Sequence, residues 1–280
     1  MREVKVAEIT RVVAELCQRA NRELPRGLRK ALLEAAEKEV SPIGREALRR
    51  LVENADLAAR EGLPICQDTG MAVVFIELGQ EVHLVGGSLA AAVDEGIRQG
   101  YRRGYLRASV VRDPLLRKNT GDNTPGVLHL SLVPGNRIRI VVAPKGFGSE
   151  NMSAVAMLTP GLGTAGVIDF VVETVRRAGA NPCPPVIVGI GLGGTMEKAA
   201  LLAKEALLRP IGTPNHEPHL AALERELLAR LNDLGLGPQG LGGRYTALAV
   251  HALAYPTHIA GLPVAVNISC HACRYAEQVI

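Results

Sequence analysis

The chain has 280 residues, of which 47% are hydrophobic and 21% charged, and its formal net charge is +4. This composition indicates a globular protein with a substantial buried core. The small, dispersed charge and the 3% of aromatic residues argue against a nucleic-acid-binding protein. The first ten residues lack the apolar core of a signal peptide, so we expect a cytoplasmic protein.

The first 62 residues are predicted to be helical. Apolar residues recur there every three or four positions, as in Ile9, Val12, Val13 and Leu16. Breaks at residues 25–27 and 41–42 divide the region into three helices. We expect this helical region, residues 1–62, to pack with the rest of the chain as one structural unit.

Residues 63–280 are predicted to form a mixed α/β body, which makes the fold class α+β. Strands are predicted over residues 71–78, 127–132, 137–142, 185–190 and 264–268. Helices are predicted over residues 89–103, 164–178, 195–208 and 219–231. The Pro-Gly-Asn sequence at 134–136 is typical of a hairpin turn, so we expect the strands on either side of it to pair.

One long stretch, residues 245–273, contains no Asp, Glu, Lys or Arg. Its length alone would allow a membrane span. However, it includes two prolines, three histidines and two cysteines, a heavy polar load for a lipid-facing helix. We therefore predict buried strands and turns around a site, and no membrane association.

Three of the five cysteines, Cys66, Cys183 and Cys270, lie in predicted turns, of which the first two are bounded by glycine or proline. Their wide spacing matches no local zinc pattern. Three thiolates gathered by the fold would ligate three irons of a four-iron cluster, whose full ligation takes four cysteines. The fourth iron would then be open, as Lewis-acid catalysis requires.

Other interpretations of the cysteines stay open at this point. A free cysteine is commonly a small buried hydrophobe, and Cys17, beside Val13 on a predicted helix, fits that description. Cys270 and Cys273 form a C-x-x-C pattern, which is also typical of a redox pair or half of a zinc site. A metal-binding scaffold without catalytic activity is therefore the alternative of a different class.

Five short segments together resemble the α part of class I fumarases and L-tartrate dehydratases, over nearly the whole chain. They are Pro-Ile-Cys-Gln-Asp-Thr-Gly at 64–70, Asn-Thr-Gly-Asp-Asn-Thr-Pro at 119–125, Lys-Gly-Phe-Gly-Ser-Glu-Asn at 145–151, Gly-Ile-Gly-Leu-Gly-Gly-Thr at 189–195 and Val-Asn-Ile-Ser-Cys-His at 266–271. The resemblance implies a [4Fe-4S] cluster bound by Cys66, Cys183 and Cys270.

The resemblance also implies a set of catalytic and substrate-binding residues. These are Gln67 and Asp68 facing the substrate, Arg107 on a substrate carboxylate, Lys145 and Gly148 in a loop that approaches the substrate, and the active-site histidine His258. An arginine suits a small dicarboxylate because it donates two parallel hydrogen bonds to one carboxylate. Without the resemblance, Arg107 would be read as a solvated residue, and Asp68 and His258 as turn residues.

Two positions depart from the family pattern. Phe147 stands where the family usually has glycine, and a positive φ there would strain a phenylalanine. Cys273 stands where a small residue is expected, so we interpret it as incidental.

The family has a second domain downstream, whereas this sequence ends ten residues after Cys270. We therefore expect a separate β subunit and a dimer of such pairs. The implied activity is the reversible hydration of fumarate to (S)-malate, with tartrate dehydration or mesaconate hydration as alternatives within the family. An open iron also implies sensitivity to oxygen.

The glycines at 189–194 formally fit the G-x-G-x-x-G pattern of a dinucleotide-binding turn. The acidic residue expected about 20 positions later is missing, since residues 209–212 read Arg-Pro-Ile-Gly. We therefore keep a nicotinamide enzyme only as a minor alternative.

Overall fold

The computed structural model describes all 280 residues, and the chain divides into two compact units. The first unit comprises residues 1–25, 55–147 and 274–280, and the second comprises residues 26–54 and 148–273. The chain passes between the units after residues 25, 54, 147 and 273. The three N-terminal helices are confirmed, but the first belongs to one unit and the second to the other.

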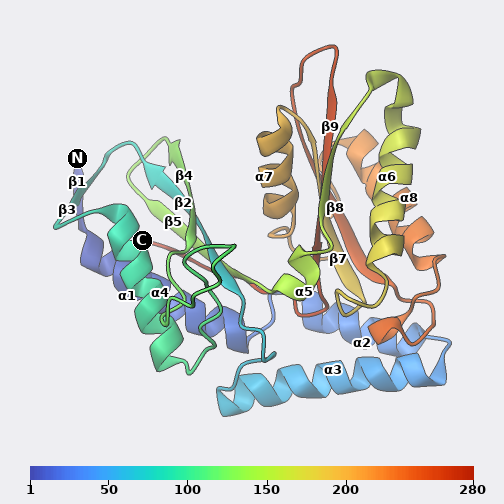
Figure 1. Ribbon diagram of the computed structural model, residues 1–280, viewed down its shortest axis with the longest axis horizontal. Coiled ribbons are helices and arrows are strands. Elements are labelled where there is room, and N and C mark those ends of the chain that lie inside the picture. The colour runs from blue at the N-terminus through green and yellow to red at the C-terminus, as the bar shows by residue number, and fades with distance from the viewer. The chain divides into compact units, whose positions relative to one another are not determined.

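The first unit is a four-stranded sheet covered on one face by two helices (Figure 1). The strand order is β10 (Ala276–Val279), β5 (Ile138–Lys145), β2 (Met71–Gly79) and β4 (Val127–Val133). The covering helices are α1 (Val6–Arg22) and α4 (Leu89–Arg103), and the strands β1 (Arg2–Lys5) and β3 (Val82–Val85) form a small parallel pair. A Cβ on Gly96 or Gly100 would lie 2.7 Å from a carbonyl oxygen of α1, so these glycines allow the two helices to pack closely.

The predicted hairpin at residues 134–136 is wrong. Strands β4 and β5 both form, but β2 lies between them and pairs parallel with β4 and antiparallel with β5. The turn instead passes over the end of β2, where the amide of Glu81 donates to Gly135 O and that of Gly79 to Arg137 O. The turn residues therefore fix a chain reversal without fixing which strands pair.

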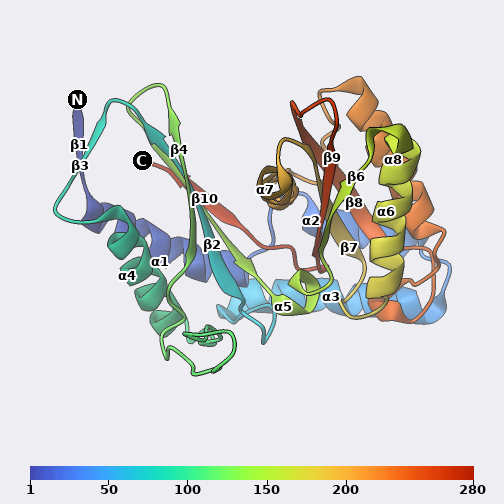
Figure 2. The same ribbon diagram turned by 45° about the horizontal axis from the view of Figure 1, so that its top comes forward.

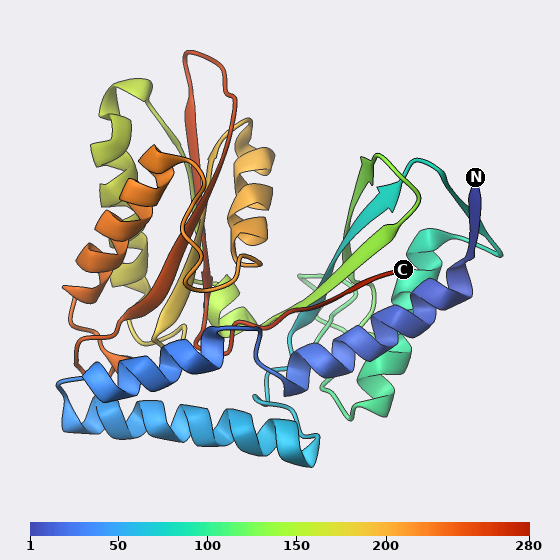
Figure 3. The same cartoon turned by 180° about the vertical axis from the view of Figure 1, so that it is seen from behind.

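The second unit has a four-stranded sheet with helices on both faces (Figure 2). The strand order is β6 (Ala154–Leu158), β9 (Leu262–Ser269), β7 (Val186–Gly193) and β8 (Ala247–Tyr255). Helix α7 (Met196–Ala206) covers one face, while α6 (Gly163–Ala178) and α8 (Pro218–Asn232) cover the other. The unit also contains α2 (Leu28–Lys38) and the 3₁₀ turns Pro160–Leu162 and Pro238–Gly240. Figure 3 shows α2 and α3 (Pro42–Glu61) lying side by side.

The α+β fold class is confirmed, and every predicted strand and helix of the body is present. Strands β1, β3, β6 and β10 were not predicted; each is only four or five residues long. The uncharged stretch 245–273 forms β8 and β9 and the segments around them. No helix has both the length and the apolar character needed to cross a bilayer.

The glycines of the G-x-G pattern serve helix packing. A Cβ on Gly189 would lie 2.1 Å from Ala203 O, and one on Gly191 would lie 1.9 Å from Ala199 O. Any larger residue on this face of β7 would push α7 off the sheet. The pattern thus has a structural explanation that involves no nucleotide.

Candidate functional site

The segment that carries Cys66 is a turn of the first unit, between the end of α3 and strand β2. Cys66 is half-buried, and the amide of its neighbour Ile65 donates to Asn21 O at 2.8 Å. Gly70 ends the turn with φ +73°, and a Cβ there would lie 2.7 Å from the backbone of Lys145. The turn is therefore fixed against α1 on one side and against the end of β5 on the other.

The carboxylate of Asp68 accepts two backbone hydrogen bonds in this turn. Oδ1 accepts the amide of Gly70 at 3.0 Å, and Oδ2 accepts the amide of Phe147 at 3.0 Å. Phe147 does not have a positive φ, so the expected strain at this position is absent. It begins the short helix α5 (Phe147–Glu150), which brings its amide to Asp68.

Arg107 lies beside Gln67. Its Nη1 donates to Gln67 Oε1 at 3.0 Å, and its backbone amide donates to Thr69 Oγ1 at 2.9 Å. The Arg107 side chain is exposed and forms no ion pair. The guanidinium of Arg107 and the side-chain amide of Gln67 thus lie together, beside the turn that also carries Cys66 and Asp68.

Two other basic residues of the first unit, Lys145 and Arg274, lie next to this turn. Lys145 is only 7% exposed, so most of its side chain is withdrawn from solvent. Arg274, which the sequence analysis missed, is 5% exposed, and its Nη2 donates to Asp68 O at 2.7 Å. No local sequence motif predicts the role of Arg274, because Arg274 and Asp68 are 206 positions apart in the sequence.

In the second unit, the segments that carry Cys183 and Cys270 lie against each other. The carbonyl oxygen of Cys183 accepts a hydrogen bond from Nδ1 of His271 at 3.1 Å and one from its amide at 3.4 Å. Gln239, also missed, donates from Nε2 to Pro184 O at 2.7 Å. Cys183 is exposed with φ +54°, a left-handed conformation that is uncommon for residues other than glycine.

Gly148 lies next to the Cys183 segment, since a Cβ on it would be 3.5 Å from Asn181 O. His258 does not lie near Cys270. The histidine precedes strand β9 and the cysteine follows it, and the eight residues of that strand extend about 26 Å. The His258 side chain is exposed, and its Nδ1 accepts the amide of Ala260 at 3.2 Å.

The remaining two cysteines are buried. Cys17 is 0% exposed in the core of the first unit, and burial raises its pKa to about 12. Cys273 is 7% exposed, and its Sγ lies 3.7 Å from Leu207 O. None of the five cysteines forms a disulfide. Within neither unit do three or more His, Cys, Asp or Glu side chains gather as a metal-ion site.

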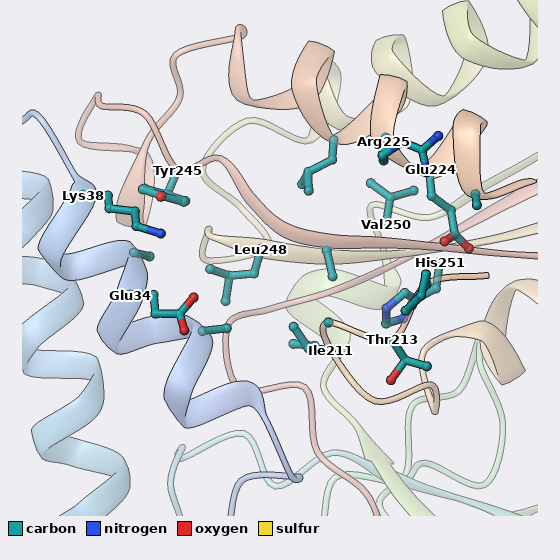
Figure 4. A pocket seen from close by; sticks show the side chains of 17 residues that line it. Glu34, Lys38, Ile211, Thr213, Glu224, Arg225, Tyr245, Leu248, Val250 and His251 are labelled. Carbon is teal, nitrogen blue, oxygen red and sulfur yellow. The ribbon is translucent and has the colours of Figure 1, made fainter. Parts of the chain in front are cut away.

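A cavity of about 380 Å³ lies elsewhere in the second unit, between α2, α8 and strand β8 (Figure 4). His251, Glu224 and Tyr245 line it, together with apolar residues such as Leu248. No cysteine and no predicted site residue contributes to its wall. The carboxylate of Glu224 already accepts a hydrogen bond from the amide of Ala252 at 2.7 Å and pairs with Arg209. It therefore satisfies a backbone amide of β8, an edge strand of the sheet.

Comparison with known proteins gives a consistent result. The model of the family described as Fumarate hydratase (Fumerase) matches residues 10–279. A protein of Methanocaldococcus jannaschii with the provisional name L(+)-tartrate dehydratase subunit alpha is 42% identical over 275 residues, 96% of both chains. The L(+)-tartrate dehydratase subunit alpha of Escherichia coli strain K12 is 32% identical over 275 residues, 96% of this chain and 89% of the relative.

Proposed function

Since this chain belongs to the fumarate hydratase (Fumerase) family, we propose that it is the cluster-binding α subunit of a two-subunit hydro-lyase. The proposed reaction is the reversible hydration of fumarate to (S)-malate. The observation that carries the proposal is the hydrogen bond from Arg107 to Gln67, in the turn that also carries Cys66 and Asp68.

We assign Cys66, Cys183 and Cys270 as the ligands of a [4Fe-4S] cluster. The assignment is supported by the donor set, because Cys183 is exposed and Cys66 and Cys270 are partly exposed, whereas Cys17 and Cys273 are buried. Three thiolates suit a four-iron cluster with one open iron. When bound, such a cluster supplies a Lewis acid at that iron. Cys66 belongs to the first unit, and Cys183 and Cys270 belong to the second.

The polar residues of the first unit have distinct proposed roles. The exposed guanidinium of Arg107 binds a carboxylate of the substrate through two parallel hydrogen bonds. Gln67, whose Oε1 accepts from Arg107, orients that guanidinium and donates its own amide to the substrate. Asp68, fixed by two backbone amides, relays a proton to the C2 hydroxyl oxygen of malate as the C2–O bond breaks. A base on the β subunit takes the proton from C3, so that the products are fumarate and water.

Further residues are proposed with narrower roles. Gly148 contacts the substrate through its backbone. The largely buried Lys145 contributes positive charge that favours an anionic substrate. The proposal that His258 is an active-site residue rests on the family resemblance alone. We propose that a separate β subunit supplies the remaining substrate contacts, in keeping with the relatives' names, which end in "subunit alpha". We further propose a dimer of such αβ pairs.

The relatives' names favour a second candidate, the dehydration of L-tartrate. Tartrate differs from malate by one hydroxyl group, and mesaconate differs from fumarate by one methyl group. Recognition of the carboxylates by Arg107 is the same in each case. The substrates are therefore distinguished by the groups that surround C2 and C3.

The test is anaerobic reconstitution with iron and sulfide, co-purification with the partner subunit, and assays on fumarate, L-tartrate and mesaconate. Substituting Cys66, Cys183 or Cys270 by serine should abolish the visible absorption of the cluster, while Cys17→Ser should leave it unchanged. A four-iron cluster that survives Cys183→Ser would refute the ligand assignment. Stoichiometric zinc without iron would favour a non-catalytic scaffold.

A further inference from the structure

The buried guanidinium of Arg274 has more donors than partners. One nitrogen, Nη2, donates to Asp68 O, while Nε and Nη1 are buried without a hydrogen-bond partner. Arg274 also forms no ion pair, although it is 5% exposed. A buried cation in this state costs stability, so its presence calls for an explanation other than stability.

The bond from Arg274 acts on the middle of the Cys66–Gly70 turn. On either side of Asp68, neutral groups form the hydrogen bonds. The amide of Ile65 donates to Asn21 O at 2.8 Å, and the hydroxyl of Tyr101 donates to Thr69 O at 2.9 Å. Arg274 donates to the turn's backbone from a charged group. Because Arg274 binds the carbonyl oxygen of Asp68, it fixes the orientation of the peptide group between Asp68 and Thr69. The orientation of this peptide group in turn fixes the position of the Asp68 Cα and Cβ atoms.

The neighbouring Gly146 shows how tightly this arrangement is packed. A Cβ on Gly146 would lie 3.1 Å from Asp68 Oδ2 and 3.8 Å from Arg274 Nη2. The carboxylate and the guanidinium of these two residues therefore lie close to the same glycine. A fixed cation here also offsets the repulsion between Asp68 and an anionic substrate, with no rearrangement during the reaction.

We propose that Arg274 is a positioning residue for Gln67 and Asp68 in the hydro-lyase reaction, an inference that depends on the function proposed above. It acts through the backbone of Asp68 and does not touch the substrate. A shift of about 1 Å at a reacting group lowers the rate by about 100-fold. Loss of Arg274 should therefore lower kcat by about this factor, whereas loss of a direct carboxylate contact would mainly raise KM.

The first experiment uses the chain alone and requires no activity. Hydrogen–deuterium exchange of residues 66–70 should accelerate at least tenfold in Arg274→Ala. The matched control is Arg22→Ala, because Arg22 belongs to the same unit and also has a buried Nε without a partner. This control should leave the exchange of residues 66–70 unchanged. Unchanged exchange in Arg274→Ala would overturn the proposal whether or not the enzyme hydrates fumarate.

The second experiment uses the reconstituted enzyme with its partner subunit. Arg274→Ala should lower kcat about 100-fold with KM within about threefold of the wild type, and added guanidinium ion should restore at least tenfold. Arg274→Lys, which keeps the charge, should retain more kcat than Arg274→Ala. Full kcat in Arg274→Ala, or a loss that guanidinium cannot restore in a variant with unchanged Tm, would overturn the positioning role. An inactive wild-type enzyme would instead count against the proposed function.

Discussion

Asn267 donates a hydrogen bond from Nδ2 to Glu150 Oε2 at 2.8 Å, which fastens strand β9 to helix α5. On its other oxygen, Glu150 pairs with Lys204 of α7 at 2.6 Å. The hydroxyl of Ser153 accepts from both Asn267 Nδ2 and the amide of Ile268, each at 3.1 Å. Glu150 and Asn267 belong to motifs that carry the family resemblance, and these contacts fix the strand that ends just before Cys270.

Glu150→Gln should destabilise the second unit. The substitution removes the charge that Lys204 pairs with and weakens a hydrogen bond to a charged group, which together cost about 1–3 kcal/mol. Urea unfolding measures the change in the free energy of unfolding. The control is Glu173→Gln on the surface of α6, whose pairs with Arg176 and Arg177 are exposed and worth at most about 0.5 kcal/mol each. Equal losses in the two variants would contradict the buried network.

The five cysteines should separate into two classes by reactivity. In the native metal-free chain at pH 8, iodoacetamide should modify Cys66, Cys183 and Cys270 and spare Cys17 and Cys273, because burial raises the Cys17 pKa to about 12 and excludes the reagent. Mass spectrometry of digested protein counts the modified sites. Labelling in urea, where all five should react, is the control. Rapid native labelling of Cys17 would show that the first unit's core is not packed as described.

Glu39 should contribute stability that depends on pH. Burial tends to raise its pKa, but hydrogen bonds from the amides of Ser41, Arg244, Tyr245 and Val40 outweigh burial and lower it. The contribution is therefore present above the ordinary glutamate pKa of 4.5 and is lost as the pH falls below it. Glu39→Gln should lower the free energy of unfolding by about 2 kcal/mol at pH 7 and by less near pH 3. Glu37→Gln, on the exposed face of α2, is the control and should have little effect at either pH.

His251 should also make stability depend on pH, in a higher pH range than Glu39 does. Burial, and secondarily the charge of Arg209, lowers its pKa from 6.5 to about 4. The unfolded chain then binds an extra proton between these values, so the wild type should lose stability as the pH falls from 6.5 to 4, at about 1.4 kcal/mol per pKa unit of difference. His251→Gln should show a flatter decline in Tm over this range. Parallel curves for the two proteins would contradict the neutral, buried imidazole.

Arg107→Lys should raise KM with little change in kcat. The substitution replaces a two-bond contact with a carboxylate by a single point charge, at a cost of about 1.5–3 kcal/mol, or roughly 10–150-fold in KM. Steady-state kinetics of the reconstituted enzyme measure both constants. Arg102→Lys, an exposed position on α4, should leave them unchanged. A fall in kcat at constant KM would contradict a role in substrate binding and would indicate that Arg107 acts in the chemical step.

The sequence by itself determined the local structure and the chemical types at the site. The spacing of Ile9, Val12 and Leu16 predicts α1 because helical periodicity depends only on neighbouring residues. Likewise, the segment from Cys66 to Asp68 brings a thiol, an amide and a carboxylate together through adjacent positions alone. Such features require no knowledge of which distant segments meet.

Only the tertiary structure decided which segments lie together. It placed β2 between β4 and β5, divided the N-terminal helices between two units, and separated His258 from Cys270 by the length of a strand. It also brought Arg274 to Asp68 across 206 positions. These relationships depend on which apolar faces bury each other and on how strands pair across the sheet. Such choices are made by the free energy of the whole fold, so no short stretch of sequence records them.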